Sequence, residues 1–119
     1  MNAASRNHDR CINYIEFNVS DMARTKEFYG WAFGWTFTDY GPDYGEFTDA
    51  RMKGSFNATA PVTPGGPLVV LYGDDLPDIQ AGIAAAGGKI VKPIFEFPGG
   101  HRFHFFDSDG YELAVWSEV

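Results

Sequence analysis

The sequence predicts an α+β fold built from two successive βαβββ modules, each a strand and a helix followed by three further strands. Apolar residues change from a period of two to a period near 3.6 and back again, and they do so twice along the chain. A shift of 54 residues also places Asp21 on Asp75 and Gly34 on Gly88, so the expected helix boundaries repeat. We therefore expect a duplicated structural unit.

The first module opens with a strand and a capped helix. Residues 14–19 alternate, with Ile15, Phe17 and Val19 on one face and Tyr14, Glu16 and Asn18 on the other. Ser20 and Asp21 can cap a helix, because a short side-chain oxygen accepts hydrogen bonds from the first backbone N–H groups. Gly34 suits a left-handed C-cap. The expected core face of this helix comprises Met22, Phe28, Tyr29, Ala32 and Phe33, with Trp31 and Trp35 also expected in the core.

The remaining elements follow from turn residues and periodicity. Strands are expected over residues 35–40, 44–49 and 54–59, then a buried strand over 68–72, a helix from the Asp75 cap to Gly87-Gly88, and strands over 89–97, 101–107 and 111–116. Pro93 favours an edge position or a bulge for the strand that contains it, because proline cannot donate to a sheet.

These elements predict a loose N-terminal arm over residues 1–10 and a single domain over residues 11–119. Module one covers 11–59, a proline- and glycine-rich linker covers 60–67, and module two covers 68–119. The lone Cys11 allows no internal disulfide, and no run is long or apolar enough to span a membrane. We therefore expect a cytoplasmic protein.

Charge and aromatic content narrow the expected partners. The formal net charge of −7 argues against nucleic acid and anionic membranes, which require a basic surface, and it can attract small cations. Aromatic residues make up 17% of the chain, which predicts a ring-rich core, an aromatic-lined pocket or both.

Three motifs carry a resemblance to a known family. They are I-E-F-N-V-S-D at residues 15–21, F-Y-x-x-x-F-G-W at 28–35, and F-F-D-S-D-G-Y-E-L at 105–113. Together with the duplicated module, they make this chain resemble the vicinal oxygen chelate superfamily, which contains glyoxalases, bleomycin-resistance proteins and extradiol dioxygenases. The resemblance implies curved mixed sheets that form an open cleft, often completed in a homodimer.

Metal-containing members of that superfamily place ligands at four strand positions. The resemblance maps three of them onto Tyr14, Leu68 and Ala114, while the fourth falls within residues 54–59, which contain no His, Cys, Asp or Glu. These residues do not supply the three or four nitrogen, oxygen or sulfur donors that Zn, Fe or Ni requires. The resemblance therefore implies a member without a metal or other cofactor.

Strand alternation predicts which side chains face the cleft. If Phe103 and Phe105 face the helices, the cleft cluster comprises Tyr14, Glu16, Asn18, Arg102, His104, Glu112 and Trp116. One alternative is a purely structural polar network, with Arg102 paired to Glu112 or Glu16. Trp116 is the best candidate for stacking on a ligand.

The leading functional prediction is metal-independent binding of a small aromatic or cationic molecule in an acidic, aromatic cleft. The alternative is a lyase or dioxygenase-type enzyme that uses Glu16, His104 and Glu112 for acid–base chemistry or as a displaced divalent metal site. A third possibility is a dimeric interaction module whose cleft is filled by its own side chains.

Overall fold

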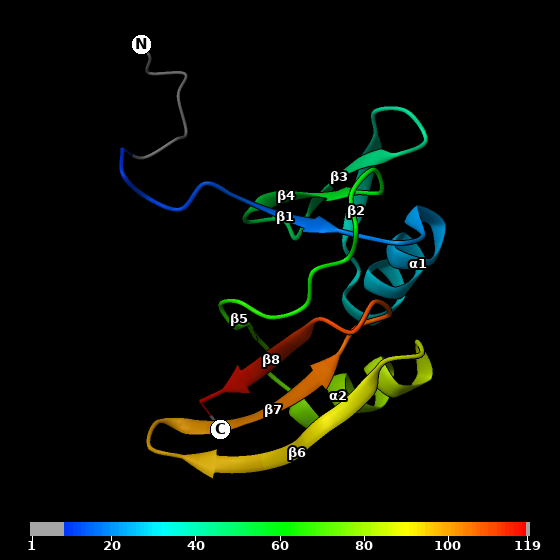
Figure 1. Ribbon diagram of the computed structural model, residues 1–119. Helices are drawn as coiled ribbons and strands as arrows, with labels where there is room; N and C mark the ends of the chain where they lie inside the picture. The colour runs from blue at the N-terminus through cyan, green and yellow to red at the C-terminus, as the bar shows by residue number, and fades with distance from the viewer. Residues whose placement is uncertain (1–8, 119) are drawn as a thin grey trace.

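Two open, four-stranded mixed sheets form the protein, which confirms the predicted fold class (Figure 1). The computed structural model describes residues 9–118, so most of the predicted arm over residues 1–10 lies outside the described residues. The first sheet has the order β1-β4-β3-β2, and its strands are β1 (Tyr14–Asn18), β2 (Thr36–Asp39), β3 (Tyr44–Thr48) and β4 (Lys53–Asn57). The second has the order β5-β8-β7-β6, and its strands are β5 (Val69–Tyr72), β6 (Lys89–Phe97), β7 (Gly100–Phe106) and β8 (Glu112–Ser117).

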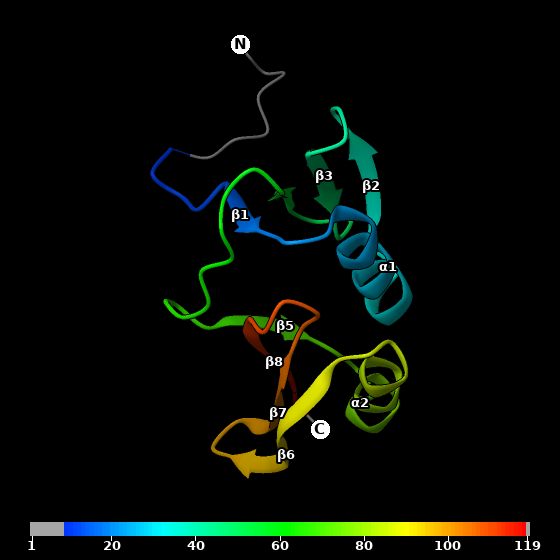
Figure 2. The ribbon, with the colours of Figure 1, turned by 45° about the vertical axis from the view of Figure 1, so that its right-hand side comes forward.

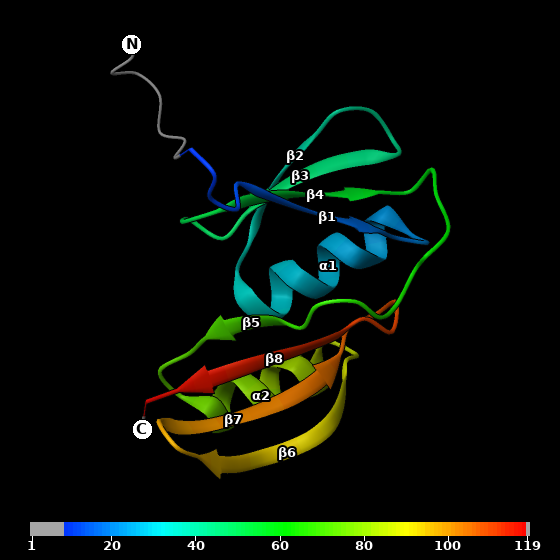
Figure 3. The ribbon, with the colours of Figure 1, turned by 60° about the vertical axis from the view of Figure 1, so that its left-hand side comes forward.

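The two sheets repeat the same pairing. In each module the first and last strands, β1 with β4 and β5 with β8, are parallel, and the other pairs are antiparallel (Figure 3). Strand β6 lies at an edge and its register with β7 shifts on either side of Lys92, so the prediction from Pro93 is confirmed.

Each module carries one helix whose start matches the predicted cap. Helix α1 (Met22–Phe33) begins at Asp21, whose carboxylate accepts a hydrogen bond from the Arg24 backbone N–H at 3.0 Å, and it ends at Gly34 with φ of 72°. Helix α2 (Leu76–Ala85) begins at Asp75, which accepts from the Asp78 N–H at 3.2 Å. Neither helix in the described part of the chain is long and apolar enough to cross a membrane.

The two helices lie beside each other on the same side of the molecule (Figure 2). Aromatic rings fill much of the core that the helices and sheets enclose. The Tyr29 and Trp35 rings stack at a centroid distance of 4.6 Å, and Trp35 stacks on Phe47 at 4.5 Å. Phe103 and Phe105 are fully buried, so the predicted inward face of β7 is confirmed.

Polar contacts join the two modules at the turn before β8. The buried Tyr29 hydroxyl donates to Asp107 Oδ2 at 2.6 Å, and Arg24 donates to Asp109 Oδ1 at 2.9 Å. Burial raises the pKa of Asp107 above its ordinary value, although the hydrogen bond from Tyr29 opposes this shift. Burial and the Asp107 charge raise the pKa of Tyr29 well above its ordinary value.

The predicted burial of residues 68–72 is wrong. Strand β5 lies at the edge of its sheet, and Val70 and Tyr72 are 42% and 50% exposed. Val69 and Leu71 pack against the core, so only one face of this apolar strand is covered. A continuous apolar run predicts burial on both faces, but within one chain the second face has no cover.

The predicted core position of Trp31 is also wrong, since this side chain is 73% exposed. Tyr29 defines the buried face of α1, and two residues further along a helix is a rotation of about 200°. Trp31 therefore lies on the far side of α1. Trp35, by contrast, packs against the core as predicted.

Candidate functional site

The face of the second sheet opposite α2 brings together four of the predicted residues. Arg102 and His104 lie on β7, Glu112 and Trp116 on β8, and the register pairs Arg102 directly with Trp116. Residues paired across an antiparallel ladder share a face, so Arg102 and Trp116 lie side by side, while His104 pairs with Ala114 and Glu112 with Phe106 further along the same face.

Arg102 lies against aromatic rings. Its guanidinium carbon is 5.7 Å from the centroid of Phe95 and 5.8 Å from that of Phe97, both on β6. Neither Glu112 nor Glu16 forms a salt bridge with it, so the alternative of a paired Arg102 is wrong for the described residues. The Nε atom of Arg102 is buried and has no hydrogen-bond partner among those residues. The guanidinium therefore lies within cation–π range of both rings.

His104 and Glu112 form a close pair. His104 Nδ1 lies 2.8 Å from Glu112 Oε2, and His104 is only 3% exposed. A neutral imidazole that donates its Nδ1 proton to the carboxylate keeps a lone pair on Nε2. Within the described chain this Nε2 is buried without a hydrogen-bond partner. The pair is thus a candidate acid–base group whose ring orientation is fixed by Glu112.

A cavity of about 280 Å³ is lined by Val70, Phe97, Arg102 and Trp116; neither His104 nor Glu112 lines it. The Trp116 ring contacts Tyr72 edge-on at a centroid distance of 5.1 Å and Phe97 at 6.3 Å. The cavity therefore combines ring faces with one cationic side chain.

The first sheet carries a separate polar cluster around Glu16. Its Oε1 atom accepts from the Ser55 hydroxyl at 2.8 Å and from the Tyr44 hydroxyl at 3.1 Å, and its Oε2 atom accepts from Asn57 Nδ2 at 3.4 Å. The Tyr14 hydroxyl lies 3.1 Å from that of Tyr44. These bonds, led by that from Ser55, lower the pKa of Glu16. The pKa of Tyr44 is raised to about 12, since the hydrogen bonds with Tyr14 and Glu16 and burial outweigh the lowering effect of Ser55.

The predicted residues thus form two groups on two sheets. Tyr14, Glu16 and Asn18 belong to the first sheet. The Asn18 backbone carbonyl accepts a hydrogen bond from the Tyr111 hydroxyl at 2.7 Å. His104 and Glu112 belong to the second, so within one chain the structure does not bring the three catalytic candidates together.

The residues at the family's metal positions do not fit a transition metal. Tyr14 has one phenol oxygen, already bonded to Tyr44, and Leu68 and Ala114 have hydrocarbon side chains. Across residues 9–118 no group of three or more His, Cys, Asp or Glu side chains is placed to hold an ion.

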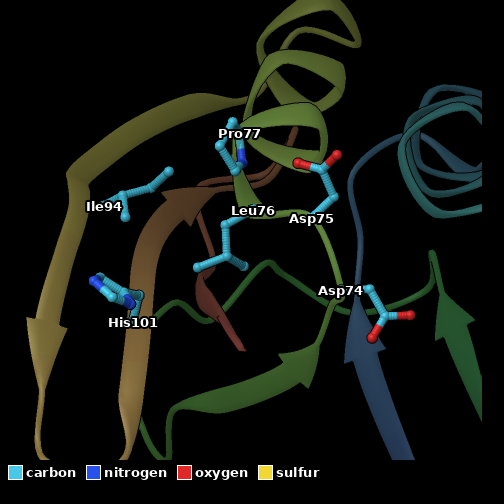
Figure 4. A pocket seen from close by; sticks show the side chains of 6 residues that line it. All are labelled: Asp74, Asp75, Leu76, Pro77, Ile94 and His101. Carbon is cyan, nitrogen blue, oxygen red and sulfur yellow. The ribbon is translucent and has the colours of Figure 1, made fainter. Parts of the chain in front are cut away.

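A second cavity, of about 400 Å³, contains none of the predicted site residues. Figure 4 shows Ile94 and His101, from β6 and β7, facing the start of α2 at Leu76 and Pro77. The Asp75 carboxylate at its rim already caps α2. Sequence reasoning missed two aromatic residues of β6: Phe97, which lines the smaller cavity, and Phe95, which lies beside Arg102 outside that lining. Strand alternation could not place them, because the register of β6 shifts near Lys92.

Comparison with known families identifies the fold family. The family model described as Glyoxalase/Bleomycin resistance protein/Dioxygenase superfamily matches residues 11–115. The chain belongs to this superfamily. Two curated members resemble it, each named "Putative glyoxylase CFP32", from Mycobacterium bovis and Mycobacterium tuberculosis. Each is 25% identical over 115 residues, covering 87% of this chain, which spans less than half (44%) of the relative.

Solved structures of three other proteins have the same fold. A glyoxalase-related enzyme from Fulvimarina pelagi superposes with a TM-score of 0.79 at 20% identity, covering 91% of this chain and 88% of that one. A superfamily enzyme from Burkholderia phytofirmans gives 0.80 at 14% identity, covering 90% and 98%. The fosfomycin resistance protein FosX from Mesorhizobium loti gives 0.76 at 13% identity, covering 94% and 95%. At these identities the likeness establishes the fold alone.

Proposed function

We propose that this superfamily member binds a small planar organic molecule, without a metal, in the cavity beside Trp116. The observation that carries the proposal is the lining itself, in which Val70 and Phe97 supply apolar surface and Trp116 supplies an aromatic face. Ligand pockets typically combine such apolar walls with a few polar groups that fix orientation. The names of the similar proteins, which refer to glyoxylase and to fosfomycin resistance, agree with a small-molecule ligand.

The predicted preference for a cation is not favoured at this cavity. The charged side chain that lines it is Arg102, and a guanidinium repels a cationic ligand. The acidic side chain Glu16 lies on the other sheet, where three donors already occupy its oxygens. We therefore propose an aromatic ligand, and not a cationic one, for this cavity.

We also propose that a second copy of the chain completes the cleft. Val70 and Tyr72 of β5 are 42% and 50% exposed, and Tyr14 of the other edge strand, β1, is 38% exposed. Exposed apolar residues gathered at sheet edges favour association. In such a homodimer, the Glu16 face of one copy would lie opposite the Trp116 face of the other.

Binding of planar probes tests the proposal. Thermal-shift and calorimetric titrations with benzamide, benzoate and 2-naphthoate should show saturable binding that Trp116→Leu weakens about tenfold or more, since stacking on one aromatic face contributes on the order of 1–2 kcal/mol. Trp31→Leu is the matched control, because Trp31 is exposed on α1. Equal loss in both variants, or no binding of any probe, would refute the proposal.

A second candidate function is acid–base catalysis by the His104–Glu112 pair, as in a lyase of this superfamily, with Glu16 contributed by a second copy. The short Nδ1–Oε2 distance and the buried, unpartnered Nε2 favour it. If it is correct, Glu112→Gln lowers turnover of a substrate while ligand affinity stays within about twofold, because Glu112 acts on the imidazole. Equal losses in turnover and affinity would count against it.

A further inference from the structure

We propose that Arg102 is the specificity group of the Trp116 cavity and that it selects a planar ligand bearing a carboxylate. This inference rests on the proposed function and assigns the chemical class of the ligand. It reverses the charge preference expected from the net charge of the chain, because the local guanidinium decides which ions the cavity accepts.

Arg102 is only partly buried and has no carboxylate partner among the described residues. Phe95 and Phe97 are two residues apart on β6, and both rings lie within cation–π range of the guanidinium, so its contacts on this side are with rings and not with acceptors. A guanidinium presents its N–H groups in its own plane, where a carboxylate can pair with them. The buried Nε has no partner among the described residues, and an unpaired buried donor is costly. Because Arg102 lines the cavity, a ligand carboxylate bound there would supply the anionic partner that the guanidinium lacks among the described residues.

The nearby carboxylates already have other partners. Glu112 Oε2 lies 2.8 Å from His104 Nδ1. The Glu16 carboxylate accepts hydrogen bonds from Ser55, Tyr44 and Asn57. Neither forms an ion pair with Arg102, which has no salt bridge among the described residues. Every acceptor that strand alternation predicted for Arg102 is therefore engaged elsewhere.

The arrangement matches an aromatic carboxylate in shape. Arg102 and Trp116 are register partners on β7 and β8 and line the same cavity of about 280 Å³. A flat ring placed against Trp116 would direct a carboxylate attached to it towards the neighbouring guanidinium. Arginine binds carboxylates with two parallel hydrogen bonds, which is the geometry that its planar fork favours.

Three probes of one shape and different charge test the inference: benzoate, neutral benzamide and cationic benzamidine. Dissociation constants are measured by calorimetry on the full chain. Benzoate should bind at least about tenfold more tightly than benzamide, and benzamidine more weakly than both, because a charge-assisted pair contributes more than a neutral hydrogen bond. In Arg102→Gln, the advantage of benzoate over benzamide should disappear.

Arg51→Gln is the matched control, since it removes the same charge from an exposed turn between β3 and β4. Arg102→Lys keeps the charge without the fork, and it should retain part of the preference even if Arg102→Gln folds poorly. Benzamide binding as tightly as benzoate in the wild type, with the Trp116 dependence intact, would overturn the carboxylate assignment and leave the proposed function standing. Absence of binding for all three probes would overturn both.

Discussion

The Tyr29–Asp107 hydrogen bond offers a sharp test of how the modules are held together. Tyr29→Phe removes a hydroxyl that donates at 2.6 Å to a buried carboxylate, and it preserves the ring that stacks on Trp35. Asp107 Oδ1 keeps its bonds from the backbone N–H groups of Asp109 and Tyr111, whereas Oδ2 loses its hydroxyl donor. Leaving a buried charged acceptor unsatisfied costs about 2–3 kcal/mol.

The cost is measured as the free energy of unfolding in urea, followed by circular dichroism. For a chain of this size it corresponds to a fall in Tm of about 10 °C. Tyr40→Phe is the control, because Tyr40 is 61% exposed, and its change should stay within about 0.5 kcal/mol.

The cost of Tyr29→Phe should also change with pH, in a direction set by the pKa of Asp107. Burial raises the folded-state pKa of Asp107, and losing the Tyr29 hydroxyl raises it further. A group whose folded pKa is raised contributes more stability below its unfolded pKa and less as the pH rises through the folded value. The destabilisation of Tyr29→Phe should therefore shrink as the pH falls from 7 towards 4. A cost below about 0.5 kcal/mol at pH 7, or one that grows on acidification, would refute this reasoning.

Two further predictions concern the first sheet. Gly54→Ala should lower the free energy of unfolding by at least about 2 kcal/mol, since a Cβ at this position would lie 2.3 Å from the Ile15 carbonyl oxygen. Gly82→Ala is the control, because a Cβ at Gly82 on α2 would meet open space and should not lower that free energy. Equal losses for the two variants in urea unfolding would disprove the steric argument. Glu16 has a lowered folded pKa, so its contribution to stability is present above its unfolded pKa of about 4.5 and is lost as the pH falls through the folded value. The stability difference between wild type and Glu16→Gln should therefore narrow in acid, and a difference unchanged down to pH 2 would exclude this role.

Local signals were sufficient to predict the elements. Asp21 and Asp75 cap the two helices because a short side-chain carboxylate satisfies the first backbone N–H groups, whatever lies around them. Gly34 adopts φ of 72°, which residues with a Cβ rarely adopt. Such effects depend on a few adjacent residues, and the sequence contains all of them.

The errors occurred where a neighbouring element decides the outcome. Trp31 is an apolar residue of a helix and was expected in the core, but the packing of α1 leaves its side chain exposed. Val70 and Tyr72 sit in an apolar run, yet β5 is an edge strand with one face uncovered within the chain. Phe95 reaches Arg102 because β6 shifts its register near Lys92, and strand alternation carries no information about a bulge.

The central claim is that the chain holds a planar ligand against Trp116. The most direct test is an NMR titration of ¹⁵N-labelled protein with benzoate, following the indole N–H signals of the three tryptophans. The account predicts a saturable shift at Trp116 and none at the exposed Trp31. A Trp116 signal that stays in place while benzoate binds would contradict it.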